Sequence, residues 1–128
     1  MSDRLDKWNA LLAEKDFDGL KTLLADDVEF HSPFIHSPKH GPEILAVILQ
    51  SIIEITENFT YHRQFVDGDD MALEFAADIG DLKLKGIDLI HWNENGQIDH
   101  FEVLIRPANA LMAVGQKMTE RLAKAGMI

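Results

Sequence analysis

Residues 82–106 read LKLKGIDLIHWNENGQIDHFEVLIR, and this stretch predicts two long strands joined by a short turn. Gly96, the glycine of the turn NENG, fits the left-handed position that precedes a G1 bulge. With this turn Asn93 faces Gln97, and counting back along the strands places Asp88 opposite Glu102. Asp88 is thus an ionisable residue at a position where an apolar residue is expected.

The two segments before this hairpin indicate which face Asp88 occupies. Residues 59–66 and 71–79 predict two further strands, and a two-residue turn at Gly80-Asp81 pairs Leu73 with Asp88. The opposite face carries two acids and two bases, which is typical of a solvated surface: Glu74, Asp78, Lys83 and Lys85. We therefore expect Asp88 on the covered face, together with the apolar residues Leu73, Phe75, Leu84 and Ile90.

Helical and turn signals account for the rest of the chain. Apolar residues at helical spacing predict a helix around residues 5–12, a shorter one from about residue 16 to residues 25–27, a third that begins at residues 41–43, and a closing helix over residues 108–124. Val28 to Ser32 alternates at period two and stops at Pro33, which predicts a short strand before a loop over residues 33–42.

The composition excludes several classes of protein. The 128 residues, 46% of them apolar, predict one domain spanning residues 1–128 that can enclose a core and a ligand cavity. A formal net charge of −10 repels phosphate backbones and anionic lipids, so no nucleic-acid or membrane-surface role is expected. No cysteine is present, which removes disulfides and thiol chemistry. With no apolar leader and no membrane-length apolar run, we expect a soluble, cytoplasmic protein.

Two stretches resemble a known family, the nuclear-transport-factor-2-like or SnoaL-like cone proteins, and within it the bacterial ketosteroid isomerases. LADD at residues 24–27, with Pro33-Phe34 and Gly41, is similar to the family's first-strand region, and GIDLIHW at residues 86–92 with GQI at 96–98 is similar to its central hairpin. The resemblance implies an α+β cone, in which a curved, mixed but mostly antiparallel sheet wraps around an apolar cavity closed by three helices from the N-terminal half. The closing helix at residues 108–124 is an addition to this pattern.

The resemblance also implies roles for individual positions. Asp88 falls on the isomerases' protonated aspartic acid, which donates a hydrogen bond to the developing oxyanion. Ser32 falls where the isomerases have their carboxylate base, and Trp8 falls where they have the tyrosine of the oxyanion hole. Serine without an activating partner is no base, and an indole cannot act as a phenol does. Steroid isomerisation by that mechanism is therefore not expected, and the resemblance implies no cofactor.

The expected environment of Asp88 suggests its chemistry. A carboxylate in an apolar cavity loses hydration, so its neutral form is favoured, and such an acid can donate to a carbonyl group or exchange protons near neutral pH. Glu102, placed opposite, would reinforce this shift through like-charge repulsion. The alternative is that Asp88 is hydrogen-bonded to Trp8 or to a backbone amide and serves only the specificity of the fold.

A histidine and several aromatic residues are further candidates. His36 lies on the predicted loop and is a candidate base at the cavity mouth, because loops over a cavity commonly carry function. We expect no metal site, since Pro38 keeps His36 and His40 from sharing a helical face and alternation points His31 away from Ser32. The candidate ligand-binding residues, which could also be plain core, are Trp8, Ser32, Phe34, Phe75, Trp92 and Glu102.

The hairpin face opposite Asp88 is predicted to be apolar as well. A sheet that is apolar on both sides must cover both, so we expect a homodimer through the outer sheet face. The predicted register assigns to this face Ile87, Leu89, Phe101, Val103 and Ile105. The position of His100 is ambiguous, because slipping the register by one residue would exchange it for Phe101.

Three functions remain open. The first is a cofactor-free enzyme of isomerase, cyclase or hydratase type that acts on a small apolar carbonyl compound, with Asp88 as acid or proton shuttle. The second is a non-catalytic binding or accessory protein whose cavity holds an apolar ligand, and the third is a scaffold that uses its dimer surface. The absence of the base carboxylate and the phenol weakens the first function without removing it, because a fold alone does not determine function.

Overall fold

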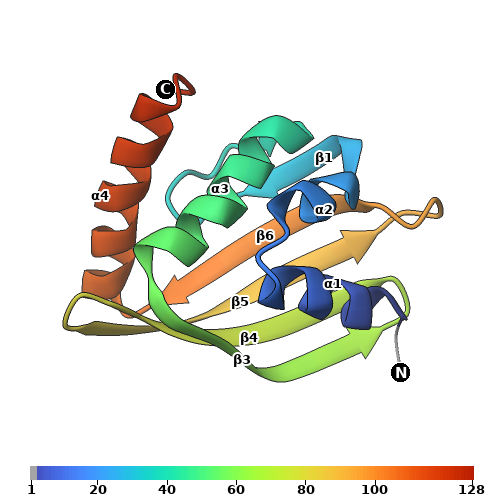
Figure 1. The fold of residues 1–128 in the computed structure, drawn as a ribbon, viewed down its shortest axis with the longest axis horizontal. Helices are drawn as coiled ribbons and strands as arrows, with labels where there is room; N and C mark the ends of the chain where they lie inside the picture. Colours follow the sequence, from blue (N-terminus) through green and yellow to red (C-terminus); the bar gives the residue numbers. More distant parts are fainter. Residues whose placement is uncertain (1–2) are drawn as a thin grey trace.

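The computed structural model describes residues 3–128 as four helices and a six-stranded sheet (Figure 1). The helices are α1 Asp3–Ala13, α2 Phe17–Thr22, α3 Pro42–Ile55 and α4 Ala108–Lys124. The strands are β1 Leu24–His31, β2 Lys39–His40, β3 Glu57–Asp67, β4 Asp70–Ile79, β5 Leu82–Trp92 and β6 Ile98–Arg106. Among residues 3–128, no helix has both the length and the apolar content needed to cross a membrane.

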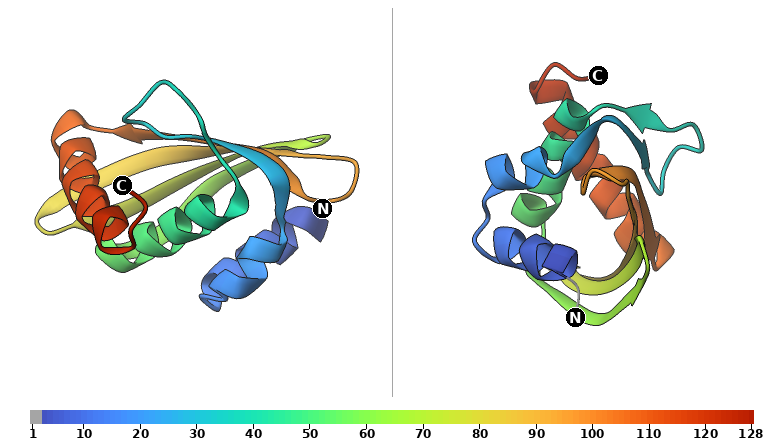
Figure 2. Two further views of the ribbon diagram at one scale, coloured as in Figure 1. Left: turned by 90° about the horizontal axis from the view of Figure 1, so that it is seen from above. Right: turned by 90° about the vertical axis from the view of Figure 1, so that its right-hand side faces the viewer.

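The sheet is mixed and curved. Its strand order is β2-β1-β6-β5-β4-β3, and β1 runs parallel to β6 while the other neighbours are antiparallel. The sheet curls around the helices when it is viewed along its strands (right-hand view of Figure 2), and α4 lies across one of its ends (Figure 1). This is the predicted α+β cone with an additional C-terminal helix.

Several local predictions are confirmed. β4 pairs with β5 in the predicted register, with Leu73 opposite Asp88 and Ile79 opposite Leu82. The bounds of α4 are those predicted, and α3 begins with Pro42 in its first turn, where a missing N–H costs nothing. Asp16 caps α2 by accepting a hydrogen bond from the backbone N–H of Gly19 at 2.9 Å.

The end of α2 was predicted too late in the sequence. The helix ends at Thr22, and Leu24 already begins β1. The backbone N–H of Ile98 donates to the carbonyl oxygen of Leu23 at 2.7 Å, which ties this corner to the start of β6. Leu24 and Ala25 are buried in the sheet, so their burial favours the extended conformation over another helical turn.

The predicted register of β5 against β6 is wrong beyond the turn. The turn itself matches, because Asn93 bonds to Gln97 and Gly96 has a φ of +76°. A further irregularity lies at Asp99, so that Trp92 faces Ile98 while His91 faces His100. This bulge shifts every later pair by one residue. Its physical gain is the burial of Phe101, which is 1% exposed and packs against the rings of Trp8 and Phe30.

Two predicted surfaces change with this register. Asp88 faces Val103 instead of Glu102, and Glu102 lies on the outer face of the sheet. The residues Phe101, Val103 and Ile105, which were predicted to face a second subunit, lie on the covered face. The apolar part of the outer face is formed instead around Ile87 and Leu104, which are 39% and 48% exposed.

The core fills the space between the concave face of the sheet and the helices. Fully buried residues from α1, α2, α3 and the sheet share one cluster, including Trp8, Leu20, Leu45, Val28, Leu73 and Ile98. A second cluster joins α4 to the β4–β5 end of the sheet through Phe75, Leu84, Ala110 and Val114. Every fourth residue of α4 from Ala110 to Leu122 is buried, which is the pattern of a helix with one apolar side.

Candidate functional site

A cavity of about 870 Å³ lies between the concave face of the sheet and α1, α3 and α4. Its sheet wall is largely aromatic and aliphatic and includes Phe30, Phe75, Phe101, Val103 and Ile105. Its helical wall includes Leu12, Ile48, Leu49, Ile52, Met112 and Met118. A lining that is mostly apolar favours the burial of an apolar ligand.

Asp88 is the single charged residue among residues 3–128 that is buried, with 6% of its surface exposed. It points to the covered face because β5 alternates, with the exposed neighbours Lys85 and Ile87 directed outward and Gly86 and Asp88 directed inward. The side chain lines the apolar cavity. The predicted position of the acid inside the cone is therefore the observed one.

A chain of two hydrogen bonds connects Asp88 to the first helix. The hydroxyl group of Tyr61 on β3 donates to Oδ2 of Asp88 at 2.8 Å. The indole Nε1–H of Trp8 on α1 donates in turn to the hydroxyl oxygen of Tyr61 at 3.0 Å. The sequence suggested a direct hydrogen bond between Trp8 and Asp88. In the structure the two residues are instead connected through the hydroxyl group of Tyr61. Among residues 3–128, no hydrogen bond reaches the other carboxyl oxygen, Oδ1.

Burial sets the protonation state of this group. Desolvation raises the pKa of Asp88 from its usual 3.8 to about 7, and the hydrogen bond from Tyr61 opposes that rise. The pKa of Tyr61 lies well above 10, first because of burial and second because of the charge of Asp88. Near neutral pH the phenol therefore stays protonated, while Asp88 is present both as an acid and as a carboxylate. Such a group can give or take a proton with little driving force in either direction.

Five of the predicted site residues are brought together. Trp8, Ser32, Phe34, Phe75 and Asp88 all line the cavity. The hydroxyl oxygen of Ser32 accepts hydrogen bonds from the backbone N–H groups of Phe34 and Ile35, at 3.3 and 3.2 Å. This use of the hydroxyl shapes the loop after β1 and leaves no sign of an activated nucleophile.

Three predicted site residues lie elsewhere. Glu102 projects from the outer face, because the bulge at Asp99 turns it away from the cavity. Trp92 is 1% exposed but belongs to the solid core, where the guanidinium group of Arg4 covers its ring. His36 is exposed on the loop and does not contribute to the cavity wall. The structure therefore does not place these three residues in the wall of this cavity.

Tyr61 is the site residue that sequence reasoning missed. It is the one tyrosine of the chain, and it pairs across strands with Phe75, a residue already predicted to lie on the covered face. Extending the strand pairing from β4 to β3 would have revealed it.

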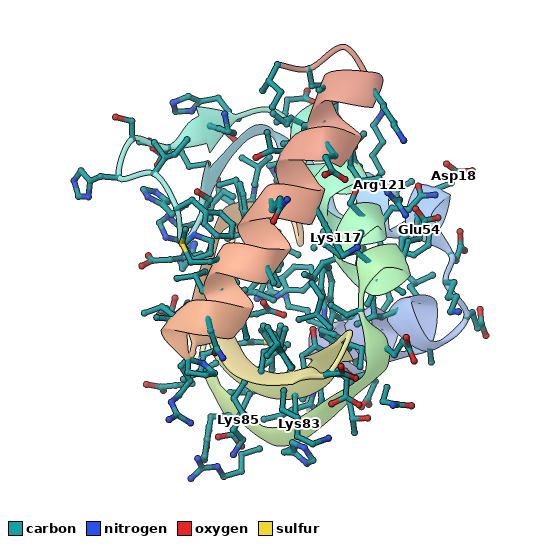
Figure 3. The ribbon with its side chains drawn as sticks, turned by 90° about the vertical axis from the view of Figure 1, so that its left-hand side faces the viewer. Asp18, Glu54, Lys83, Lys85, Lys117 and Arg121 are labelled. Carbon is teal, nitrogen blue, oxygen red and sulfur yellow. The ribbon has the colours of Figure 1, made fainter. Side chains whose placement is uncertain are left out.

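The cavity also owes part of its wall to α4, which was predicted as a helix but not as part of the site. Met112, Val114 and Met118 line the cavity from this helix. Figure 3 shows Arg121 on α4 directed toward Glu54 on α3, and the two form an ion pair at 2.5 Å. Hydrogen bonds from Gln50 and from Arg121 lower the pKa of Glu54. The pair is half exposed, so it orients α4 more than it stabilises the fold.

Comparisons with known proteins give a consistent result. The family model described as SnoaL-like domain matches residues 5–101. The crystal structure of a steroid delta-isomerase from Pseudomonas aeruginosa is similar with a TM-score of 0.90 and 40% identity, over 98% of this chain and 93% of that chain. An uncharacterised protein with a cystatin-like fold from Silicibacter pomeroyi has a TM-score of 0.90 and 32% identity, over 96% and 87% of the two chains.

More distant likenesses concern the fold alone. An NTF2-like protein of unknown function from Cytophaga hutchinsonii has a TM-score of 0.65 and 20% identity, over 84% of this chain and 91% of that chain. No curated protein sequence matches this chain.

Proposed function

Because this chain belongs to the SnoaL-like domain family, we propose that its cavity binds a small apolar carbonyl compound and that Asp88 moves a proton on it. The reaction class is a cofactor-free isomerisation, cyclisation or hydration. The observation that carries the proposal is the carboxyl group of Asp88, buried in an apolar wall, with a pKa of about 7 and a phenol on one of its oxygens.

The cavity supports a ligand of this kind by its size and lining. Its volume of about 870 Å³ lies in the range that holds small organic molecules. Because its walls are apolar, binding is driven by the removal of apolar surface from water. The few polar groups inside it then determine which way a ligand's carbonyl group points. Tyr61 and Asp88 are the polar groups that are joined to one another there.

The hydrogen-bond geometry supports a proton shuttle. In its charged form Asp88 accepts a proton at Oδ1 from the carbon next to the ligand's carbonyl group, and the bonding electrons move to the carbonyl oxygen. The neutral carboxyl group no longer requires the hydrogen bond from Tyr61, so the phenol is free to donate to the new oxyanion. Asp88 then returns the proton to another carbon, which completes an isomerisation with no net gain or loss of atoms.

The relation to the steroid delta-isomerase narrows the substrate class only in part. That protein is 40% identical to this chain, and a steroid ketone is one example of an apolar carbonyl compound. By the resemblance described above, the ketosteroid isomerases have a carboxylate base at the position of Ser32 and a tyrosine at the position of Trp8. In this chain the phenol comes from β3 as Tyr61, and Asp88 is left to act as both acid and base.

The test is turnover of a bulky β,γ-unsaturated ketone, followed by the ultraviolet absorption of the conjugated product. Asp88→Asn keeps the shape of the side chain but cannot exchange a proton, so we expect kcat to fall by about 100-fold or more. Glu102→Gln makes the same chemical change on the outer face and should leave kcat unchanged. Full turnover by Asp88→Asn would refute the proposed role.

The alternative is a non-catalytic small-molecule-binding protein. It is favoured by the hydroxyl of Ser32, which is used by the loop, and by the lack of a second buried acid among residues 3–128. A ligand retained through purification, identified by native mass spectrometry, and bound equally well by the wild type and by Asp88→Ala would support it. Turnover that depends on Asp88 would exclude it.

A further inference from the structure

The outer face of β1 and β6 carries an arrangement of two histidines and two glutamates. The parallel pairing of the two strands places Glu29 beside His100 and His31 beside Glu102. Residues two apart along a strand point to the same side, so all four side chains share the outer face. We call Glu29, His31, His100 and Glu102 the His-Glu square. The two histidines occupy one diagonal of this square and the two glutamates occupy the other.

Three of the four ligand groups of the square are already close together, and the fourth, Glu102, lies beside His100. Glu29, His31 and His100 each have one nitrogen or oxygen atom within 4.8 Å of the others. The rings of His31 and His100 are stacked, with centroids 4.6 Å apart and planes 29° apart. Nε2 of His100 lies 3.4 Å from Oε1 of Glu102. All four residues are partly buried, so they are accessible to an ion but partly shielded from bulk water.

We propose that the His-Glu square binds one Zn²⁺ ion. Imidazole nitrogens and carboxylate oxygens are zinc ligands, and two of each can complete a tetrahedral site. Bond lengths of about 2.1 Å require neighbouring ligand atoms about 3.4 Å apart. The atoms of Glu29, His31 and His100, which lie within 4.8 Å of one another, must therefore approach by up to about 1.4 Å, and the carboxylate of Glu102 must turn toward them from beside His100. Rotation about their side-chain torsions provides this movement, because no strand has to shift. The formal charge of −10 further attracts a cation to the surface.

The square differs from the histidines that the sequence brings near one another. His36 and His40 are neighbours of His31 along the chain, but the three-residue ligand group contains neither of them. His100 comes from β6 instead. His91, which faces His100 from β5, is hydrogen-bonded to Asp99, with Nδ1 and Oδ1 2.6 Å apart. Because the square lies on the opposite side of the sheet from the cavity, the proposal is independent of any reaction at Asp88.

The test uses the full chain after metal removal with a chelator, titrated with zinc chloride by isothermal calorimetry. We expect one ion per chain with a dissociation constant in the micromolar range or below. His31→Gln and His100→Gln should each weaken binding by about tenfold or more. His62→Gln removes an exposed histidine from β3 and should leave the affinity unchanged.

Circular dichroism shows whether each variant is folded, and Glu29→Gln replaces any histidine variant that is not. Weaker binding by Glu29→Gln then supports the site, and wild-type affinity in that variant overturns it. The proposal also fails if the wild type shows no saturable binding, or if His62→Gln loses as much affinity as His31→Gln. In those cases the stacked histidines form only a surface cluster of acids and bases.

Discussion

The hydroxyl group of Tyr61 donates to Oδ2 of Asp88 at 2.8 Å, and this contact joins the outermost strand of the sheet to its central hairpin. The hydrogen bond stabilises the charged form of the acid, whereas burial stabilises the neutral form. Burial has the larger effect, so the contact reduces the rise in the pKa of Asp88 without cancelling it.

Removal of the phenol hydroxyl should raise the pKa of Asp88 further. In Tyr61→Phe the charged carboxylate loses its donor, while the apolar surroundings remain. The pKa can be measured by NMR from the carboxyl carbon of Asp88. Trp8→Phe removes the donor to the Tyr61 oxygen but leaves the hydrogen bond from Tyr61 to Asp88, so it should give a smaller pKa shift in the same direction. A pKa that falls in Tyr61→Phe would show that the hydrogen bond does not favour the charged form.

The raised pKa of Asp88 makes stability depend on pH. Between its usual value of 3.8 and about 7, the folded protein keeps a proton that the unfolded chain has lost, so the free energy of unfolding falls as pH rises. The full effect is roughly 4 kcal/mol. Asp88→Asn does not titrate and should gain stability relative to the wild type between pH 5 and pH 8, as measured by urea unfolding. If the free energies of unfolding of Asp88→Asn and the wild type differ by the same amount at pH 5 and at pH 8, the prediction is contradicted.

Gly86→Ala should be strongly destabilising. A Cβ atom at this position would overlap the carbonyl oxygen of Leu104 and the ring of Phe75, and the carbonyl belongs to a paired strand that cannot move aside. We expect a loss of about 2–4 kcal/mol in the free energy of unfolding. Gly68→Ala is the control, because a Cβ atom there meets no atom within 4 Å. Its positive φ alone should lower the free energy of unfolding, by about 1 kcal/mol. Equal losses in the two variants would mean that the strands relax around the new atom.

We also propose that the chain forms a homodimer through the outer face around Ile87 and Leu104, which are direct neighbours on β5 and β6. Both side chains are exposed in the single chain, and an apolar pair in the middle of a sheet face favours a partner. The double variant Ile87→Asp, Leu104→Asp should be monomeric by light scattering after gel filtration. Lys117→Asp on α4 introduces an acid elsewhere and should stay dimeric. A monomeric wild type would remove the proposal.

The sequence was sufficient where a structural feature depends on local alternation. The turn at Gly80-Asp81 leaves one plausible pairing of its strands, and the contact between Leu73 and Asp88 follows from it. The bulge at Asp99 was not predictable, because His100 and Phe101 each fit an alternating strand and only the packing of the core distinguishes them. The position of Asp88 was independent of this error, since it was determined from the β4 side.

The site was predicted less completely than the fold. Contacts such as that between Tyr61 and Asp88 depend on strand pairing across the sheet, and the sequence of one strand does not name its partner. The bounds of α4 were read correctly from its apolar side, but that pattern is the same whether the helix covers solid core or a cavity. The His-Glu square escaped notice because its two strands are far apart along the chain.

The bulge at Asp99 has a consequence for how this protein can vary. This one extra residue determines which side chains of β6 face the interior. With it, the aromatic and aliphatic side chains point inward and the charged side chains point to solvent. A change of side chain at this position leaves that assignment intact. A deletion there would exchange the two faces of the strand. His100 and Glu102 would then point into the interior, and Phe101 would point to the outer face. Chain length should therefore be under tighter constraint here than residue type.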